Sequence, residues 1–345
     1  MDGALRQGCR ARLPVSCAGA ACLRPMLPEA RVVQGRGAAM VQQGDQPAGR
    51  AGSAALFDVL ALEGRVKVVD VGAAPGGRPS WAGMMRDGRV DLVAIEPDAG
   101  QAERLRRHFG ARATVLEHVI GDGSPGLFRE TAHGFTASLL EPDNTLAAAF
   151  NNLAPLSRVV NRRPVTTHRL DDLAEVEGAD FLKIDAQGGE AAILAGAPRT
   201  LARALAVEIE VMFLPLYSGQ ALFADLDIAL RAAGFVFHTF LQAGRRTFAP
   251  MRIGDDPDKG LNQVLWADAV YVRDWMALDA LGTDHLRRYA ALMHGLYGSF
   301  DLALRIAHEI DRRTGSDTAR AYETLLQTGA VDPAHGMSHH RPAGG

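Results

Sequence analysis

Short apolar runs alternate with longer amphipathic stretches downstream of residue 65. "VKVVDVG" (66–72) and "VDLVAIEPD" (90–98) have the pattern of buried strands that each end in a turn. "PSWAGMMRDG" between them and "AGQAERLRRHFG" (99–110) after them have the apolar spacing of helices. "ATVLEHVIGD" (113–122) predicts a third strand. Strand–helix alternation of this kind predicts a parallel sheet with helices on both faces.

The alternation then breaks and resumes. Residues 126–143 predict a small hairpin, and residues 144–163 predict an irregular insertion or lid. "FLKIDAQGGE" (181–190) begins with a fourth strand, and "LARALAVEIEVMF" (201–213) supplies a fifth, followed by a helix over 221–235. Two later apolar runs, "FVFHTFLQ" and "QVLWADAVYVRD", are expected to pair as a terminal antiparallel hairpin.

The two ends of the chain have other patterns. Residues 1–50 lack apolar periodicity, so we expect them to be disordered or to result from a start codon assigned too early. We interpret residues 51–273 as one domain, 274–330 as a helical appendage for packing or homo-oligomer formation, and 331–345 as a disordered tail. The appendage is expected to contain helices over residues 276–281, 284–296, 299–313 and 317–328.

Composition excludes several classes of function. The 345 residues carry a net charge of −3, which gives no reason to expect a nucleic acid or an anionic membrane as partner. No run approaches the roughly 18 apolar residues of a membrane span. All three cysteines lie in the first 22 residues, which excludes a cysteine nucleophile or cysteine-ligated metal from the remainder. A reducing cytoplasm fits this usage.

The turn "VDVGAAPGG" follows a strand and opens a helix. Gly72, Gly76 and Gly77 tolerate backbone conformations that let a ligand approach closely. As a dinucleotide fingerprint the turn is imperfect, because Ala74 stands where the second glycine is expected. Asp70, just before the turn, opposes a pyrophosphate but would attract the α-amino group of S-adenosylmethionine.

The next two strands also end in acids. Glu96 is placed to accept hydrogen bonds from both ribose hydroxyls of a cofactor, whether that cofactor is a nicotinamide or a methionine derivative. Asp122 is placed to accept from an adenine amino group. The alternative for each acid is that it caps the following helix, and three successive strands ending in acids favour the binding interpretation.

These segments together resemble the FkbM family of S-adenosylmethionine-dependent methyltransferases. The resemblance covers about residues 60–273 and rests on "VVDVGAAPGG", "AIEPD", "LDDL" followed by "DFLKIDAQGGEAAILAGA", and "EIEVMFLPLYSGQALFADLDIALRAAGF". It implies an α/β class I methyltransferase (Rossmann-like) fold with a seven-stranded, mostly parallel sheet. It also implies O-methylation of a hydroxyl on a sugar, glycan or secondary-metabolite acceptor. By position, Asp70, Gly72 and Ala73 would hold the methionine end, Glu96 the ribose and Asp122 the adenine.

"DAQGGE" is expected to form the floor of the reaction site. Ligands of such sheets sit beyond the carboxyl ends of the strands, so Asp185 is expected to face the sulfonium and the transferable methyl group. The Gly188–Gly189 turn starts a helix whose N-terminal amides favour an acid at Glu190. The alternative is that Asp185 caps this helix and Glu190 complements its dipole.

An alcohol acceptor must lose a proton, so a base or a metal is expected. Candidate bases are Asp185, Glu190, Glu208, Glu210 and His168, which lies just before "RLDDL". Asp185 and Glu210 could hold Mg²⁺ through carboxylate oxygens. Glu210, Tyr217 and Gln220 are assigned to the acceptor side of the site.

Two other functions stay open. The glycine turn and Glu96 also suit an NAD-dependent oxidoreductase, although no hydride-transfer dyad is recognisable. A methyltransferase-fold module that binds ligand without turnover is the other alternative. Nucleic-acid methylation is disfavoured, because the chain contains neither an N/D-P-P-aromatic nor a Pro-Cys motif and its core has no basic tract.

Overall fold

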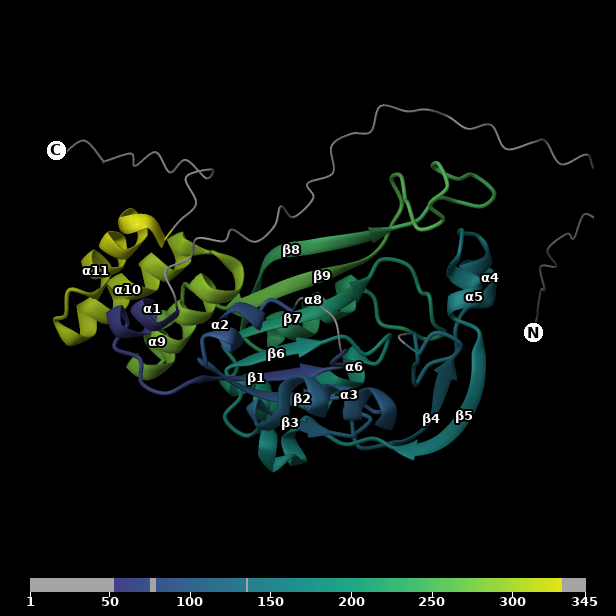
Figure 1. The fold of residues 1–345 in the computed structure, drawn as a ribbon, viewed down its shortest axis with the longest axis horizontal. Coiled ribbons are helices and arrows are strands. Elements are labelled where there is room, and N and C mark those ends of the chain that lie inside the picture. Colours follow the sequence, from purple (N-terminus) through teal and green to yellow (C-terminus); the bar gives the residue numbers. More distant parts are fainter. Residues whose placement is uncertain (1–52, 75–78, 135, 331–345) are drawn as a thin grey trace, which may run out of the picture. The chain divides into compact units, whose positions relative to one another are not determined.

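A seven-stranded sheet organises the computed structural model, which describes residues 53–74, 79–134 and 136–330 (Figure 1). The expectations for residues 1–50, for the tail at 331–345, and for Gly76 and Gly77 concern residues outside these ranges. The seven strands are β1 (Val66–Val71), β2 (Val90–Ile95), β3 (Ala113–Leu116), β6 (Phe181–Ile184), β7 (Ala206–Met212), β8 (Phe235–Arg245) and β9 (Val264–Arg273).

The strand order confirms the predicted fold. The sheet runs β3-β2-β1-β6-β7-β9-β8. The pairs from β3 to β7 are parallel, whereas β9 is antiparallel to both β7 and β8. This is the class I methyltransferase arrangement. The strand order in the parallel part runs outward from β1 in one direction to β3 and then in the other direction from β6 to β7, and the sheet ends in the antiparallel pair of β8 and β9. This reversal of the strand order places the carboxyl ends of β1 and β6 side by side, where open α/β sheets bind their ligands.

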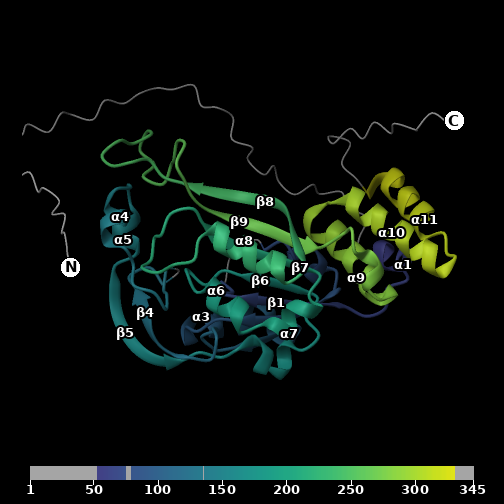
Figure 2. The same cartoon turned by 180° about the vertical axis from the view of Figure 1, so that it is seen from behind.

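Helices cover both faces because the strands are apolar on both. Along β1, Val66 and Val68 join one buried cluster, and Val69 and Val71 join the other. The first face packs against α1 (Ser53–Val59), α2 (Ala82–Arg86) and α3 (Ala99–Phe109). The second packs against α6 (Glu190–Ala195), α7 (Pro198–Arg203) and α8 (Phe223–Ala232), as Figure 2 shows.

The C-terminal helices are part of the first core and do not form a separate appendage. Tyr289, Ile306 and Tyr322 are fully buried in the same cluster as Val68 and Phe181 of the sheet. Figure 1 shows α1 beside α11, although these segments lie far apart in the chain. The C-terminal elements are η4 (Leu278–Ala280), α9 (Thr283–Leu292), the π-helical η5 (Met293–Tyr297), α10 (Phe300–Thr314), α11 (Thr318–Leu325) and the π-helical η6 (Leu326–Ala330).

The middle of the chain differs from the expectation. β4 (Pro125–Thr131) pairs mainly with β5 (Val159–Thr166) in a two-stranded sheet. Among the described residues of 126–143, a single bridge between Arg129 and Ser138 remains of the expected local hairpin. The expected irregular insertion over 144–163 contains α4 (Asn144–Ala148), α5 (Leu153–Leu156) and the first part of β5. Three 3₁₀ turns lie elsewhere in the chain: η1 (Gly110–Arg112), η2 (Leu170–Asp172) and η3 (Ala174–Val176). Pattern alone could not show this pairing, because it joins residues about 35 positions apart.

The third strand is also shorter than expected, ending at Leu116 rather than at residue 122. Ile120 leaves the sheet ladder and forms an isolated bridge with His168.

Candidate active site

Acidic side chains line the carboxyl half of one sheet face. Strand register places Asp70 of β1 beside Lys183 of β6, Lys183 beside Glu208 of β7, and Glu210 beside Asp268 of β9. Alternation along the strands puts these residues on the face that carries the C-terminal helices. We call the following six acids the acid row: Asp70, Glu96, Asp185, Glu208, Glu210 and Asp268.

Lys183 lies between two members of this row. Its Nζ is 3.8 Å from Oδ1 of Asp70 and 3.7 Å from Oδ2 of Asp185. Burial favours the neutral amine, but the charges of Asp70 and Asp185 outweigh this effect and raise the pKa of Lys183. Burial also raises the pKa of Asp70, with Lys183 opposing the shift. Asp70 Oδ1 is buried and faces Lys183, and the indole of Trp81 also lowers the pKa of Asp70.

Gly72 allows β1 and β6 to end in contact. Its φ is +79°, and a Cβ at this position would clash with the main-chain carbonyl of Asp185. Gly72 N and Ala73 N both donate to the carbonyl of Ile95, at 2.9 and 3.2 Å. The sequence predicted that a ligand approaches Gly72 closely. In the structure the main chain at Asp185 approaches Gly72 closely.

We therefore expect Gly72→Ala to lower the free energy of unfolding by about 3 kcal/mol or more, because it combines a left-handed backbone with a backbone clash. Gly64 has a similar φ of +78°, but a Cβ on Gly64 would have no other atom within 4 Å. Gly64→Ala should then cost only about 1 kcal/mol. Urea unfolding of both variants measures the difference, and equal losses would show that the contact with Asp185 is unimportant.

Gln187 joins two acids of the row. Its Nε2 donates to Asp185 Oδ1 at 2.9 Å and to Glu210 Oε2 at 2.8 Å. Burial raises the pKa of Glu210 well above its ordinary value, and the charges of Asp185 and Glu190 raise it further. The amide lies where a cation bridging Asp185 and Glu210 would sit, and among the described residues no group of three or more His, Cys, Asp or Glu is arranged to hold a metal ion. The possible Mg²⁺ site between Asp185 and Glu210 is therefore not supported.

Glu190 binds the main chain of the turn that follows β6. Its Oε1 accepts hydrogen bonds from Ala186 N at 3.0 Å and from Gly188 N at 3.1 Å. The side chain is 2% exposed, and burial raises its pKa to about 7 despite these hydrogen bonds. Through these contacts Glu190 holds the main chain of residues 186–188 in place, and a catalytic role for its carboxylate stays a prediction.

Two of the three residues assigned to the acceptor side, Tyr217 and Gln220, are buried. Tyr217 is buried, and its hydroxyl donates to Thr136 O at 3.1 Å and to Gln187 Oε1 at 3.2 Å. Gln220 Oε1 accepts from Tyr217 N, while Gln220 Nε2 is buried without a partner in the described residues. Tyr217 therefore orients Gln187, and direct acceptor contact by Tyr217 or Gln220 stays a prediction.

His168 and Asp122 lie on the segments that follow β5 and β3. His168 O accepts from Gly121 N, and its ring stacks on His118 with centroids 4.1 Å apart. None of the described contacts of His168 is with Asp185, so its role as a base stays a prediction. Asp122 is exposed and accepts from Ser124 N at 2.9 Å, which lowers its pKa; its contact with adenine stays a prediction.

Glu96 follows β2 beside Asp70. Its Oε1 accepts from Asp98 N at 2.8 Å. Burial raises the pKa of Glu96 to about 7, and the charges of Asp98 and Asp70 contribute to the increase. Glu96 is thus half ionised near neutral pH, and a ligand that donates to the carboxylate would favour the charged form.

Sequence reasoning missed Lys183 and Gln187. Lys183 is one of only three lysines in the chain and interrupts an otherwise apolar strand, which was the available signal. Gln187 had no signal, because its role depends on a φ of +51° that directs its amide between two strands.

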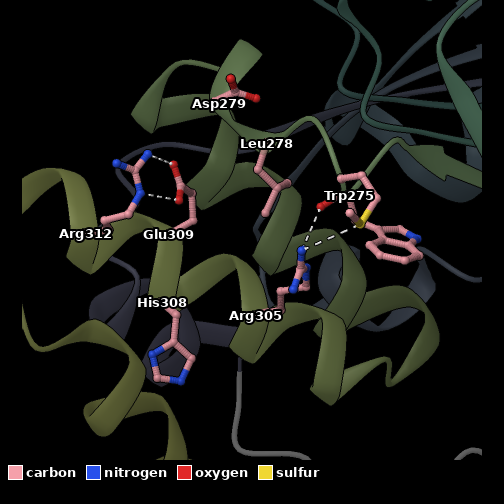
Figure 3. Close-up of a pocket in the computed structure, with 8 residues that line it drawn as sticks. Trp275, Leu278, Asp279, Arg305, His308, Glu309 and Arg312 are labelled. Atoms are coloured by element: carbon pink, nitrogen blue, oxygen red, sulfur yellow. Dashed lines mark hydrogen bonds and ion pairs between the residues drawn. The ribbon is translucent and has the colours of Figure 1, made fainter.

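A surface pocket of about 640 Å³ lies away from the acid row, between η4 and α10 (Figure 3). Its two arginines are paired: Arg312 Nε donates to Glu309 Oε2 at 2.7 Å, and Arg305 Nη2 donates to Trp275 O at 3.4 Å. It contains none of the residues that the sequence pointed to.

The fold and the acid row define a methyltransferase-type α/β protein. Residues 70–237 match the family profile described as Methyltransferase FkbM domain, so the chain carries this domain and the resemblance is confirmed. A curated relative, 2-O-methyltransferase NoeI of Sinorhizobium fredii (strain NBRC 101917 / NGR234), is 28% identical over 179 residues, covering 47% of this chain and 70% of the relative.

Solved structures show only distant likeness. The precorrin-6Y C5,15-methyltransferase of Geobacter metallireducens GS-15 has a TM-score of 0.31 and 12% identity, covering 64% of this chain and 87% of that one. A putative tRNA (m1A22) methyltransferase of Streptococcus pneumoniae, Sp1610, in complex with S-adenosyl-L-methionine, has a TM-score of 0.30 and 12% identity, covering 79% and 97%. At these scores neither protein bears on the site or its substrate. Over the described residues, every helix is too short or too polar to cross a membrane.

Proposed function

We propose that the chain is an S-adenosylmethionine-dependent O-methyltransferase that acts on a hydroxyl of a sugar, glycan or secondary-metabolite acceptor. The FkbM domain supports the methyltransferase class, and the 2-O-methyltransferase relative supports oxygen as the methyl acceptor.

The acid row is the observation that carries the cofactor assignment. Six carboxylic acids and Lys183 occupy the carboxyl half of one sheet face. Carboxylates at this edge attract the ammonium and sulfonium charges of S-adenosylmethionine and repel the pyrophosphate of NAD. The carboxylate of Asp70 suits the α-amino group, and Glu96 suits the ribose hydroxyls. These two proposed contacts agree with the roles that the family resemblance implies for Asp70 and Glu96.

The residues of β6 would then serve the acceptor. When bound, the cofactor supplies an electrophilic methyl group on a sulfonium. Asp185, whose side chain is 34% exposed, is placed to accept the hydroxyl proton as the new O–CH₃ bond forms and the S–CH₃ bond breaks. Lys183 and Gln187 hold this carboxylate from two sides, and Glu190 fixes the loop beneath it. Orientation of this kind can supply roughly 7–11 kcal/mol of barrier reduction.

A binding and transfer experiment tests the proposal. Calorimetric titration of the full chain with S-adenosylmethionine, S-adenosylhomocysteine and NAD should show micromolar binding of the first two alone. Incubation with methyl-labelled cofactor and a panel of sugars, glycans and hydroxylated natural products should then label one acceptor class at oxygen. Binding of NAD alone would contradict the proposal, and cofactor binding without transfer to any acceptor would favour a non-catalytic module.

The pKa of Glu96 predicts a pH dependence of cofactor binding. Ribose hydroxyls donate to the ionised carboxylate, so affinity falls as pH drops through the free-protein pKa of about 7. Between pH 8 and pH 6 the ionised fraction of Glu96 falls about tenfold, and its contribution to S-adenosylhomocysteine affinity should fall equally. Glu96→Gln should lack this tenfold component when titrated with the same ligand. An identical pH profile in both proteins would exclude Glu96 from the ribose site.

A further inference from the structure

Glu208 accepts hydrogen bonds from two hydroxyls on different elements. Ser80 Oγ, just before α2, donates to Glu208 Oε2 at 2.7 Å. Tyr297 OH, the last residue of η5, donates to the same oxygen at 3.2 Å. Glu208 is 5% exposed, so these donors replace the water that an ionised carboxylate would otherwise require.

Tyr297 comes from outside the matched family domain, which ends at residue 237. The π-helical turn that carries it packs against α2, because Gly295 leaves room there for the side chain of Met84. The Tyr297 ring also contacts Phe181 of β6 edge-on, with centroids 6.4 Å apart. Irregular helical turns of this type often occur at functional sites. Here the turn delivers one hydroxyl to the acid row.

We propose that Tyr297 is a positioning residue of the methyl-transfer site that holds Glu208 charged, so that the site prefers the positive sulfonium of S-adenosylmethionine over the neutral thioether of the product. The inference rests on the proposed function. It assigns the C-terminal helices a role in discriminating substrate cofactor from spent cofactor, and not only in packing.

The charges around Glu208 make its ionisation sensitive to one hydrogen bond. Burial raises the pKa of Glu208 to about 7, and Ser80 and Lys183 oppose the shift. Burial and the Glu208 charge raise the pKa of Tyr297 well above its ordinary value, so the phenol remains a donor. The titratable, charged and donor groups that face Glu208 come from five elements and are Asp70, Ser80, Lys183, Asp268 and Tyr297.

Tyr297→Phe removes one donor to the ionised carboxylate and should raise the pKa of Glu208 by about one unit. A pKa increase of one unit lowers the ionised fraction of a carboxylate by up to about tenfold. We expect roughly fivefold weaker binding of S-adenosylmethionine but less than about twofold weaker binding of S-adenosylhomocysteine, because only the former carries the sulfonium charge. The acidic limb of S-adenosylmethionine binding should also move to higher pH.

Calorimetry on the full chain measures the ratio of the S-adenosylmethionine affinity to the S-adenosylhomocysteine affinity in Tyr297→Phe. Ser80→Ala is a second variant should the first not fold. Tyr289→Phe is the matched control, because its hydroxyl lies in the same helices but donates to Arg273 O at 2.7 Å. In a Glu208→Gln background, Tyr297→Phe should have no further effect on the ratio.

The outcomes separate the two proposals. A wild-type chain that binds neither cofactor form would overturn the proposed function. Normal wild-type binding with an unchanged ratio in both Tyr297→Phe and Ser80→Ala would overturn this inference alone. An equal ratio change in Tyr289→Phe would also overturn it, since general loosening of the helices would then explain the effect.

Discussion

Asp70→Asn should weaken S-adenosylmethionine binding about 100-fold. The substitution keeps the shape of the side chain but replaces the buried carboxylate that is proposed to bind the α-amino group. Loss of a charge-assisted hydrogen bond to an ammonium group, together with loss of its charge, accounts for a change of this size. Isothermal titration at pH 7.5 measures it.

A truncated ligand provides the control for this prediction. 5′-Methylthioadenosine contains the nucleoside but lacks the amino-acid end of the cofactor. Its affinity should change by less than about twofold in Asp70→Asn, whereas Glu96→Gln should weaken both ligands. Equal weakening of both ligands by Asp70→Asn would mean that the substitution disturbs the fold of the site through Lys183, 3.8 Å away, and does not remove a specific contact.

Asp185→Asn should lower the rate of methyl transfer about 1,000-fold while cofactor affinity changes by less than about threefold. The amide cannot take the hydroxyl proton, and general base catalysis contributes about 10²–10⁴-fold. Gln187 Nε2 can still donate to the amide oxygen, so the geometry of the loop should persist. Single-turnover transfer to the labelled acceptor, compared with cofactor titration, separates the two effects.

His168→Asn serves as the comparison for the base. His168 stacks on His118 and bridges Ile120, and no described contact joins it to Asp185, so its loss should change the transfer rate by less than about threefold. A large rate loss in His168→Asn with normal transfer by Asp185→Asn would contradict the assignment of the base.

The acids at the strand ends are the part of the candidate site that the sequence predicts best. Asp70, Glu96 and Asp185 could be located because each interrupts or ends an apolar run, and parallel strands bring their carboxyl ends to one edge. For His168, nothing in the sequence indicates that the segment before "RLDDL" bridges Ile120, a contact between distant segments. For Glu190, nothing in it indicates the two backbone hydrogen bonds that the buried carboxylate accepts, and the catalytic roles of both residues stay predictions.

The sequence by itself determined the strand–helix alternation, the terminal hairpin, the C-terminal helices and the acids at the strand ends. These features follow from local periodicity and turn residues, which depend on near neighbours in the chain. The tertiary structure alone decided that Lys183 lies between Asp70 and Asp185, that Gln187 joins Asp185 to Glu210, and that Tyr297 reaches Glu208. Strand order and register create these contacts between residues up to 113 positions apart, as for Asp70 and Lys183, and no local pattern encodes such pairs.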